Sequence, residues 1–171
     1  KEIFSQISTL RSKLEQIFVD KWEQHRTELG DTKLGIFLGV KDEFGMSRYL
    51  KLSKFPLHRI AITKLRLSAH KLPIEVGRYE QIPRHERRCP LGCPQIGDEV
   101  HYIFQCSHPF MLDLRNNLIN KMVQTDEWNT LQGMGHTEQL RSLLKSPVKE
   151  IVCLIGSYAF KVLKLFRDLT I

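Results

Sequence analysis

The sequence lacks an apolar run long enough to cross a membrane. The longest candidate covers residues 151–160, between Glu150 and Lys161, whereas a transmembrane helix needs about 20 apolar residues. The beginning of the chain also lacks the pattern of a secretory signal peptide. We therefore expect no membrane contact and a cytoplasmic or nuclear protein. Because the chain opens with Lys1 rather than Met, we also expect it to be a piece of something longer.

Cysteine is scarce, with four in 171 residues. An odd cysteine left beside a clustered set of three argues against disulfides and for a reducing compartment. Cys153 is the odd one. It lies in an apolar run, so we expect it in the core.

The other three cysteines form a metal-ligand pattern with one histidine. Cys89, Cys93, His101 and Cys106 follow the spacing C-x3-C-x7-H-x4-C, and three thiolates with one imidazole match the closed tetrahedral set that Zn²⁺ prefers in structural sites. The Pro- and Gly-bearing stretch 90–92 is a turn that can fold two thiolates toward one ion. The last two ligands could lie one turn apart on a short helix. The sequence therefore predicts one structural Zn²⁺.

Two alternatives to this reading of the motif stay open. The cysteines could be ordinary buried thiols of a reduced protein, with His101 a hydrogen-bonded core residue. His108 could also replace His101 as the fourth ligand.

Apolar spacing predicts a mainly α fold, namely a helical domain with an embedded CCHC zinc knuckle. The expected segments are an N-terminal helical segment (1–58), a basic helix and loop (59–88), the knuckle (89–106) and a C-terminal helical segment that packs on the core (107–171). Helices are expected at 2–26, 33–44, from Pro56 onward, and at 109–123, 136–144 and 148–168, with loops at 72–88 and 126–135.

The first of these helices carries an apolar seam with alternating steps of four and three residues. The seam consists of Ile3, Ile7, Leu10, Leu14 and Ile17. An apolar seam of this kind is normally buried against another protein surface. We expect it to pack on the same chain or on a neighbouring domain, and a short coiled-coil dimer is the alternative.

The net charge of +7 suggests an acidic partner, and its distribution is uneven. Eight basic and three acidic residues between Arg59 and Arg88 supply five of the seven excess charges. The guanidinium group of arginine presents a fork of hydrogen-bond donors that fits phosphate, so we expect this stretch to bind nucleic acid. The alternative is that these charges only form a solvated surface. The expected contact residues are Arg59, Lys64, Arg66, Lys71, Arg78, Tyr79, Arg84, Arg87 and Arg88.

Tyr79 is included because an aromatic ring in a basic loop can stack on unpaired bases. Tyr102 and Phe104 are further aromatic candidates, but Phe104 is more typical of a core. His70 could act as a general base, but no Ser or Cys nucleophile is visibly paired with it. We expect instead that His70 makes a hydrogen bond that locks the turn before Pro73.

The stretch from Lys64 to Cys106 carries a family likeness. Arg66, Ser68 and His70 form an R-x-S-x-H element, the residues Ile74, Glu75, Gly77, Arg78 and Tyr79 form an IE-x-GRY element, and the four ligands follow. This region resembles the part after the polymerase in non-LTR (long interspersed element type) retrotransposon reverse transcriptase-like proteins. It departs from that family at Ser107, because the family usually has Pro directly after the last Cys.

The resemblance implies a domain that grips template RNA or target DNA within a parent reverse transcriptase and endonuclease. The chain itself lacks a Tyr/Phe-x-Asp-Asp polymerase string, so we expect a binding domain and no enzyme. Helix-mediated contact with the rest of the parent is a further expected partnership. Two other function classes stay open, namely the DNA-binding tail of a transposase-like protein and a zinc-stabilised protein-interaction module.

Overall fold

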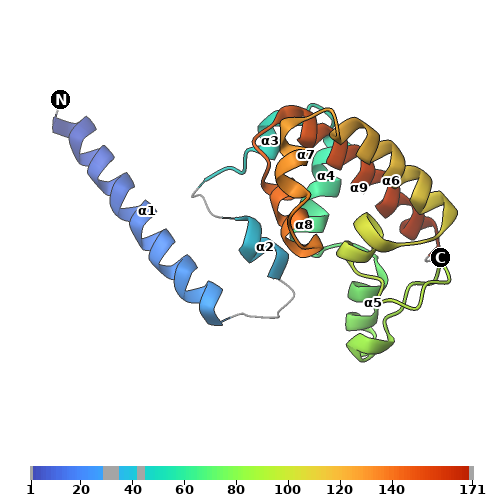
Figure 1. Cartoon of the computed structure of the whole chain (residues 1–171). Helices are drawn as coiled ribbons and strands as arrows, with labels where there is room; N and C mark the ends of the chain where they lie inside the picture. Colours follow the sequence, from blue (N-terminus) through green and yellow to red (C-terminus); the bar gives the residue numbers. More distant parts are fainter. Residues whose placement is uncertain (1, 29–34, 42–44, 170–171) are drawn as a thin grey trace.

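The computed structural model describes residues 2–28, 35–41 and 45–169, and it is built from helices (Figure 1). Within these residues the β structure is limited to an isolated antiparallel bridge between Arg88 and Ile96. The predicted mainly α fold is confirmed. The α-helices are α1 (Glu2–Glu28), α2 (Gly35–Val40), α3 (Tyr49–Leu52), α4 (Pro56–Arg66), α5 (Pro73–Tyr79), α6 (Pro109–Met122), α7 (Asp126–Leu131), α8 (His136–Lys145) and α9 (Lys149–Leu169), with a 3-10 turn at Arg84–Glu86 and a π-helical turn at His101–Gln105.

Helix α9 is the centre of the helical body. It packs most extensively against α4, and it also contacts α3, α6 and α8. Apolar residues at helical spacing form a buried stripe along α9, although Cys153, which we expected in the core, is only half-buried. The buried residues of this stripe are Ile151, Val152, Ile155, Tyr158, Ala159, Val162 and Phe166.

A glycine sets the distance between α4 and α9. A Cβ atom added at Gly156 of α9 would lie 2.8 Å from the Cβ of His58 and 3.3 Å from the Cδ1 of Ile62, both on α4. A larger residue would push the two helices apart, because protein interiors are close-packed. Gly156 therefore permits the close approach of the two central helices.

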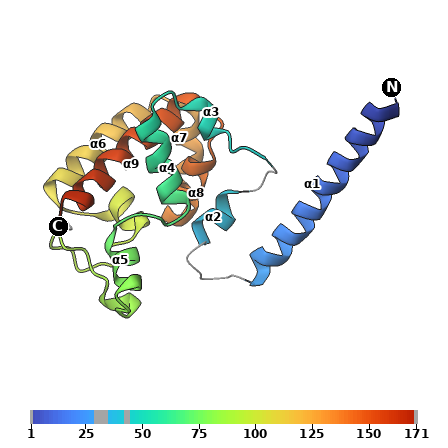
Figure 2. The ribbon, with the colours of Figure 1, turned by 180° about the vertical axis from the view of Figure 1, so that it is seen from behind.

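Helix α1 projects away from the helical body in both views (Figures 1 and 2). The five seam residues are between 51% and 70% exposed, so the seam does not pack on the rest of the described chain. The other end of α1 is held by Trp22, whose indole N–H donates to the carbonyl of Lys41 at 2.7 Å and whose ring meets Phe37 edge-on. The described residues of this chain therefore do not cover the seam, and its packing on a neighbouring domain stays a prediction.

The other predicted elements are mostly confirmed. The expected helices at 2–26, 109–123, 136–144 and 148–168 correspond to α1, α6, α8 and α9, and Pro56 begins α4. The helix expected at 33–44 is shorter, since α2 ends at Val40, and residues 33, 34 and 42–44 lie outside the described residues. Two expected loops contain helices instead: α5 begins at Pro73, and α7 begins after Thr125.

Proline explains the first of these two errors. Pro73 occupies the first turn of α5, where its missing N–H costs nothing and its fixed φ favours a helix.

Among the described residues, none of the helices combines the length and apolar character that a bilayer crossing requires.

Candidate metal centre and basic groove

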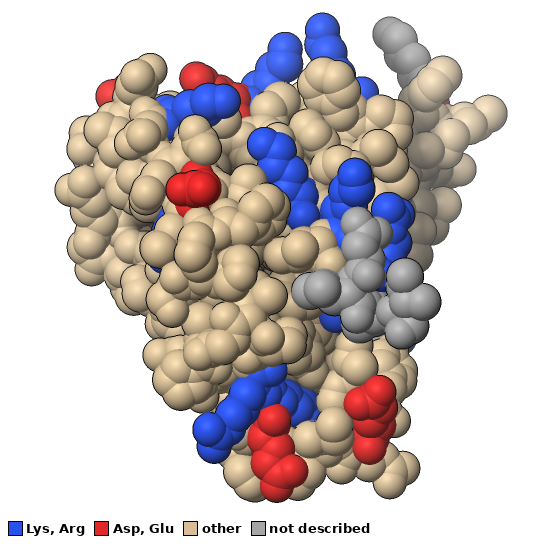
Figure 3. Space-filling model, turned by 90° about the vertical axis from the view of Figure 1, so that its right-hand side faces the viewer, with Lys and Arg blue, Asp and Glu red and all other residues tan. Residues whose placement is uncertain are grey.

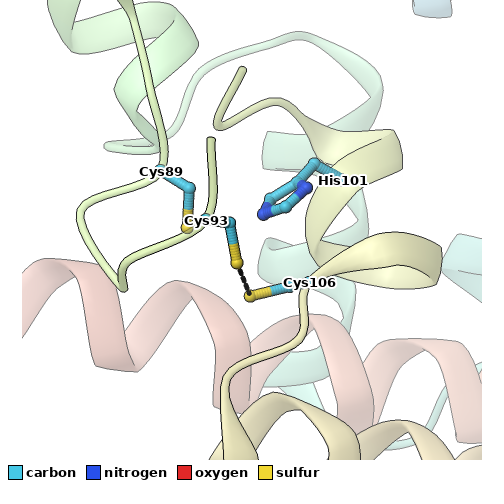
Figure 4. A group of neighbouring side chains, drawn as sticks. All are labelled: Cys89, Cys93, His101 and Cys106. Atoms are coloured by element: carbon cyan, nitrogen blue, oxygen red, sulfur yellow. Dashed lines mark hydrogen bonds between the residues drawn. The ribbon is translucent and has the colours of Figure 1, made fainter. Parts of the chain in front are cut away.

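The four predicted ligands converge on one point (Figure 4). Cys89, Cys93, His101 and Cys106 are all buried, and their ligand atoms lie within 4.8 Å of one another. The Sγ atoms of Cys93 and Cys106 are 3.7 Å apart. Two thiolates on a tetrahedral ion with bonds of about 2.3 Å would be separated by about 3.8 Å. The cluster is therefore the right size to hold one metal ion, and His108 is not part of it.

A tight turn positions the first two ligands. The peptide N–H of Cys89 donates to the carbonyl of Gln95 at 3.0 Å, and the Arg88–Ile96 bridge closes the base of this loop. Gly92 has a φ of +90°, a conformation that residues with a Cβ rarely adopt. The predicted turn between Cys89 and Cys93 is thus confirmed.

A π-helical turn positions the other two ligands. The N–H of Cys106 donates to the carbonyl of His101 at 2.8 Å, five residues earlier, which brings the two side chains onto the same side. The carboxylate of Asp98 accepts the N–H of His101 at 2.9 Å at the start of the turn. Arg115 of α6 donates to the carbonyls of Ile103 and Cys106. The ligand-bearing turn is therefore tied to the helical body.

The chemistry of the donor set fits a metal ion. Both ring nitrogens of His101 are buried without a hydrogen-bond partner among the described residues, and such orphaned groups are costly unless something binds them. Burial lowers the pKa of His101, which favours the neutral imidazole that can ligate.

The thiol pKa values differ between two of the ligands. Burial raises the pKa of Cys93, but hydrogen bonds from Ser107 and from the neighbouring cysteines outweigh burial and lower the pKa to about 7. Burial and the neighbouring thiols raise the pKa of Cys106 to about 12. A first thiolate therefore forms readily, and a divalent cation would relieve the charge repulsion that opposes the others.

A buried polar cluster joins the candidate metal segment, residues 89–106, to the end of α4. His70 Nε2 lies 2.8 Å from the carboxylate of Glu99, and the hydroxyl of Ser68 donates to the same oxygen at 3.3 Å. Burial raises the pKa of Glu99, but the hydrogen bond and charge of His70 outweigh burial and lower it. The N–H of Leu72 donates to His70 Nδ1 at 3.4 Å. His70 thus locks the turn before Pro73, as predicted, and Glu99 is a partner that the sequence did not indicate.

Arg66 is a structural residue, so its prediction as a nucleic-acid contact was wrong. Its side chain is buried, and its guanidinium donates to the carbonyls of Leu144 at 2.7 Å and Val40 at 3.1 Å. It also lies over the ring of Tyr49 at 4.9 Å. Buried Tyr102 is likewise closed to stacking on bases, and half-buried Phe104 stacks on His136.

Three other cations that were predicted to contact nucleic acid are half-buried and make hydrogen bonds or ion pairs within the chain. Arg59 donates to the carbonyl of Ser53, and Arg87 donates to the carbonyls of Ile82 and Ile74. Arg78 pairs with Glu75 at 3.0 Å and lies over the ring of Tyr79. Of the predicted contact residues, the exposed ones are Lys64, Lys71, Tyr79, Arg84 and Arg88.

Three of the exposed residues line a groove between α4 and α9. Lys64, Lys71 and Tyr79 share this groove, whose volume is about 490 Å³, with Lys164 and Arg167 of α9. None of the described residues that line it is acidic. Figure 3 shows a cluster of Lys and Arg on the side of the molecule where α9 ends. The Asp and Glu residues visible in this view lie apart from that cluster. The structure therefore assembles four cations from two helices and a loop.

The sequence contains a signal for the two groove cations of α9. Lys161, Lys164 and Arg167 recur every three residues, which places them on one side of a helix. Only the fold could show that its polar side adjoins Lys64.

A second hollow, of about 510 Å³, is lined by residues of α2, α5 and α8 and carries side chains of both charges. Arg78, Arg84 and Arg87 line it together with Arg141, but so do three acidic residues. Arg84 is 3.7 Å from the carboxylate of Asp98. This hollow is therefore less favourable for a polyanion than the α4–α9 groove, whose described lining has no acidic residue.

Comparisons with models of known families, with curated proteins and with solved structures find no match for this chain.

Proposed function

We propose that this chain is a zinc-stabilised helical domain that binds nucleic acid, as the resemblance to retrotransposon proteins implies. The observation that carries the proposal is the groove between α4 and α9, which gathers Lys64, Lys71, Lys164 and Arg167 without an acidic lining residue among those described. Such a surface attracts phosphates without regard to base sequence.

Zinc is the metal that the donor set favours. Three thiolates and one imidazole are soft to borderline ligands, and Zn²⁺ takes four of them in a closed tetrahedral site. When bound, the ion would supply rigidity and no reaction chemistry, because all four positions are filled by the chain. Cys89, Cys93, His101 and Cys106 would hold it.

The metal supports the groove through the buried polar cluster. Glu99 lies two residues before His101 and contacts His70, which precedes Lys71. A rigid candidate metal segment therefore fixes the loop that carries Lys71 and leads into α5, the helix that ends at Tyr79. This link gives the zinc a role in binding without any contact between the ion and nucleic acid.

Salt dependence of binding tests the proposal. If the four groove cations neutralise phosphates, the logarithm of affinity should fall against the logarithm of salt with a slope of about −2.8 for a single strand and about −3.6 for a duplex. Fluorescence anisotropy with a labelled oligonucleotide measures this slope. Lys164→Ala should remove one phosphate contact and make the slope shallower by about one. Lys13→Ala, at an exposed position on α1, is the matched control. An affinity that does not change with salt would reject the proposal.

A role in helix-mediated contact with a parent protein has its own support. The seam of α1 remains exposed along its length, and a heptad-spaced apolar face of this kind pairs with another helix. The seam lies outside the groove, so both contacts can coexist.

A further inference from the structure

We infer that the α4–α9 groove binds a single-stranded nucleic acid, with its unpaired bases against an apolar floor and its phosphates on the cationic rim. This inference rests on the proposed function and goes beyond it, because the phosphate contacts alone do not distinguish one strand from two.

The floor of the groove is apolar and accessible. Leu57 and Ile60 of α4 are 56% and 51% exposed, and Phe160 and Leu163 of α9 also line the groove. Leu57 and Ile60 are three residues apart on a helix, so they belong to one face. An apolar strip of this kind on a domain surface marks a binding site.

Tyr79 stands at the same groove as a candidate stacking platform. Its ring is 67% exposed although the guanidinium of Arg78 lies 4.2 Å from the ring centroid. The Arg78–Glu75 ion pair holds that guanidinium, which in turn orients the ring. An oriented and accessible aromatic ring beside cations is the arrangement by which proteins bind single strands.

The floor discriminates against a duplex. A duplex turns its base faces inward and presents phosphates and groove edges, which would have to lose water against Leu57 and Ile60 without gaining hydrogen bonds. Unpaired bases have apolar faces that such a floor can cover. The combination of an apolar floor with a cationic rim therefore suits one strand better than two.

Three labelled probes test the inference on the full chain. They are a thymidine oligonucleotide of about 12 nucleotides, the same strand with abasic sites throughout, and the corresponding thymidine–adenosine duplex. The abasic strand keeps every phosphate and lacks every base. We expect it to bind at least about tenfold more weakly than the thymidine strand, and the duplex to bind more weakly as well.

Variants assign the difference to the groove. Tyr79→Ala should weaken thymidine-strand binding by about fivefold or more and leave abasic-strand binding unchanged, whereas Tyr79→Phe should retain binding. Phe110→Ala, at an exposed aromatic on α6, is the control outside the groove. Tyr79 is exposed, so these variants should fold, and circular dichroism checks this.

The outcomes separate this inference from the proposed function. Equal binding of the thymidine and abasic strands, or of the strand and the duplex, would overturn the inference and leave nucleic-acid binding intact. Failure of all three probes would overturn both. Binding of an acidic, leucine-bearing helical peptide with no binding of the strands would make the groove a protein-docking site instead.

Discussion

Three polar residues of the R-x-S-x-H element stabilise the fold. Arg66 donates to two backbone carbonyls on other elements, and Ser68 and His70 both contact Glu99. Each of these groups is buried, where an unpaired polar group is costly and a paired one specifies the arrangement of its neighbours. In this chain the three polar residues of the element therefore have a structural role.

Replacing Arg66 should destabilise the protein. Arg66→Met keeps most of the side-chain length but leaves the carbonyls of Leu144 and Val40 unpaired, so we expect a loss of about 2–4 kcal/mol in the free energy of unfolding. Urea denaturation measures it. Lys64→Met, at an exposed position on the same helix, should change stability by less than about 0.5 kcal/mol. Equal stabilities of the two variants would contradict the structural role of Arg66.

Residue spacing predicted which four side chains converge on one point, but it could not predict which cations are exposed. The ligand set depends on a local pattern of 18 residues that requires no knowledge of the rest of the fold. The burial of Arg66 depends on Val40 and Leu144, which are 26 and 78 residues away along the chain. Charge in a sequence says that a residue prefers water, and tertiary contacts decide whether it reaches it.

At the scale of elements, the close packing of α4 on α9 creates both the core and the groove. Ala61, Ile62 and Leu65 of α4 are buried, while Leu57 and Ile60 on its adjoining side are exposed. The apolar residues of this helix thus divide between core and groove floor. Periodicity indicated the helix but could not show this division, because it depends on where α9 lies.

Enlarging Gly156 should disturb this packing. Gly156→Ala places a Cβ within 2.8 Å of His58. Alanine favours a helix by about 1 kcal/mol over glycine, but overpacking typically costs about 1–3 kcal/mol, so we expect a net loss of stability. Gly133→Ala, where no atom lies within 4 Å of the added Cβ, is the matched control. Thermal unfolding compares the two variants, and a Gly156→Ala protein more stable than Gly133→Ala would show that the two helices are not constrained there.

At the scale of the whole molecule, direct contacts join the candidate metal segment to the helical body and to the groove. The π-helical turn is tied to α6 by Arg115 and to α9 by Tyr158, whose hydroxyl donates to the carbonyl of Tyr102 at 2.7 Å. The Glu99–His70 contact then connects the same segment to the loop before α5. Loss of the metal should therefore be felt at Lys71 and Tyr79, while Lys164 and Arg167 remain on α9.

Removing the metal should weaken nucleic-acid binding in a measurable way. One of the four groove cations, Lys71, would lose its fixed position, so the salt slope for a single strand should become shallower, from about −2.8 to about −2.1. Anisotropy titrations at several salt concentrations, before and after chelation, measure the change. Restoring Zn²⁺ should restore the slope. A slope unaffected by chelation would uncouple the metal from the groove.

The most direct test of the account is the metal content of the folded protein, measured by native mass spectrometry. We predict one zinc ion per chain and none in the Cys93→Ser variant, which should also lose structure around residues 84–110, because structural zinc contributes about 10–16 kcal/mol of binding energy in small zinc domains. A wild-type protein that is fully folded with no bound metal would contradict the account.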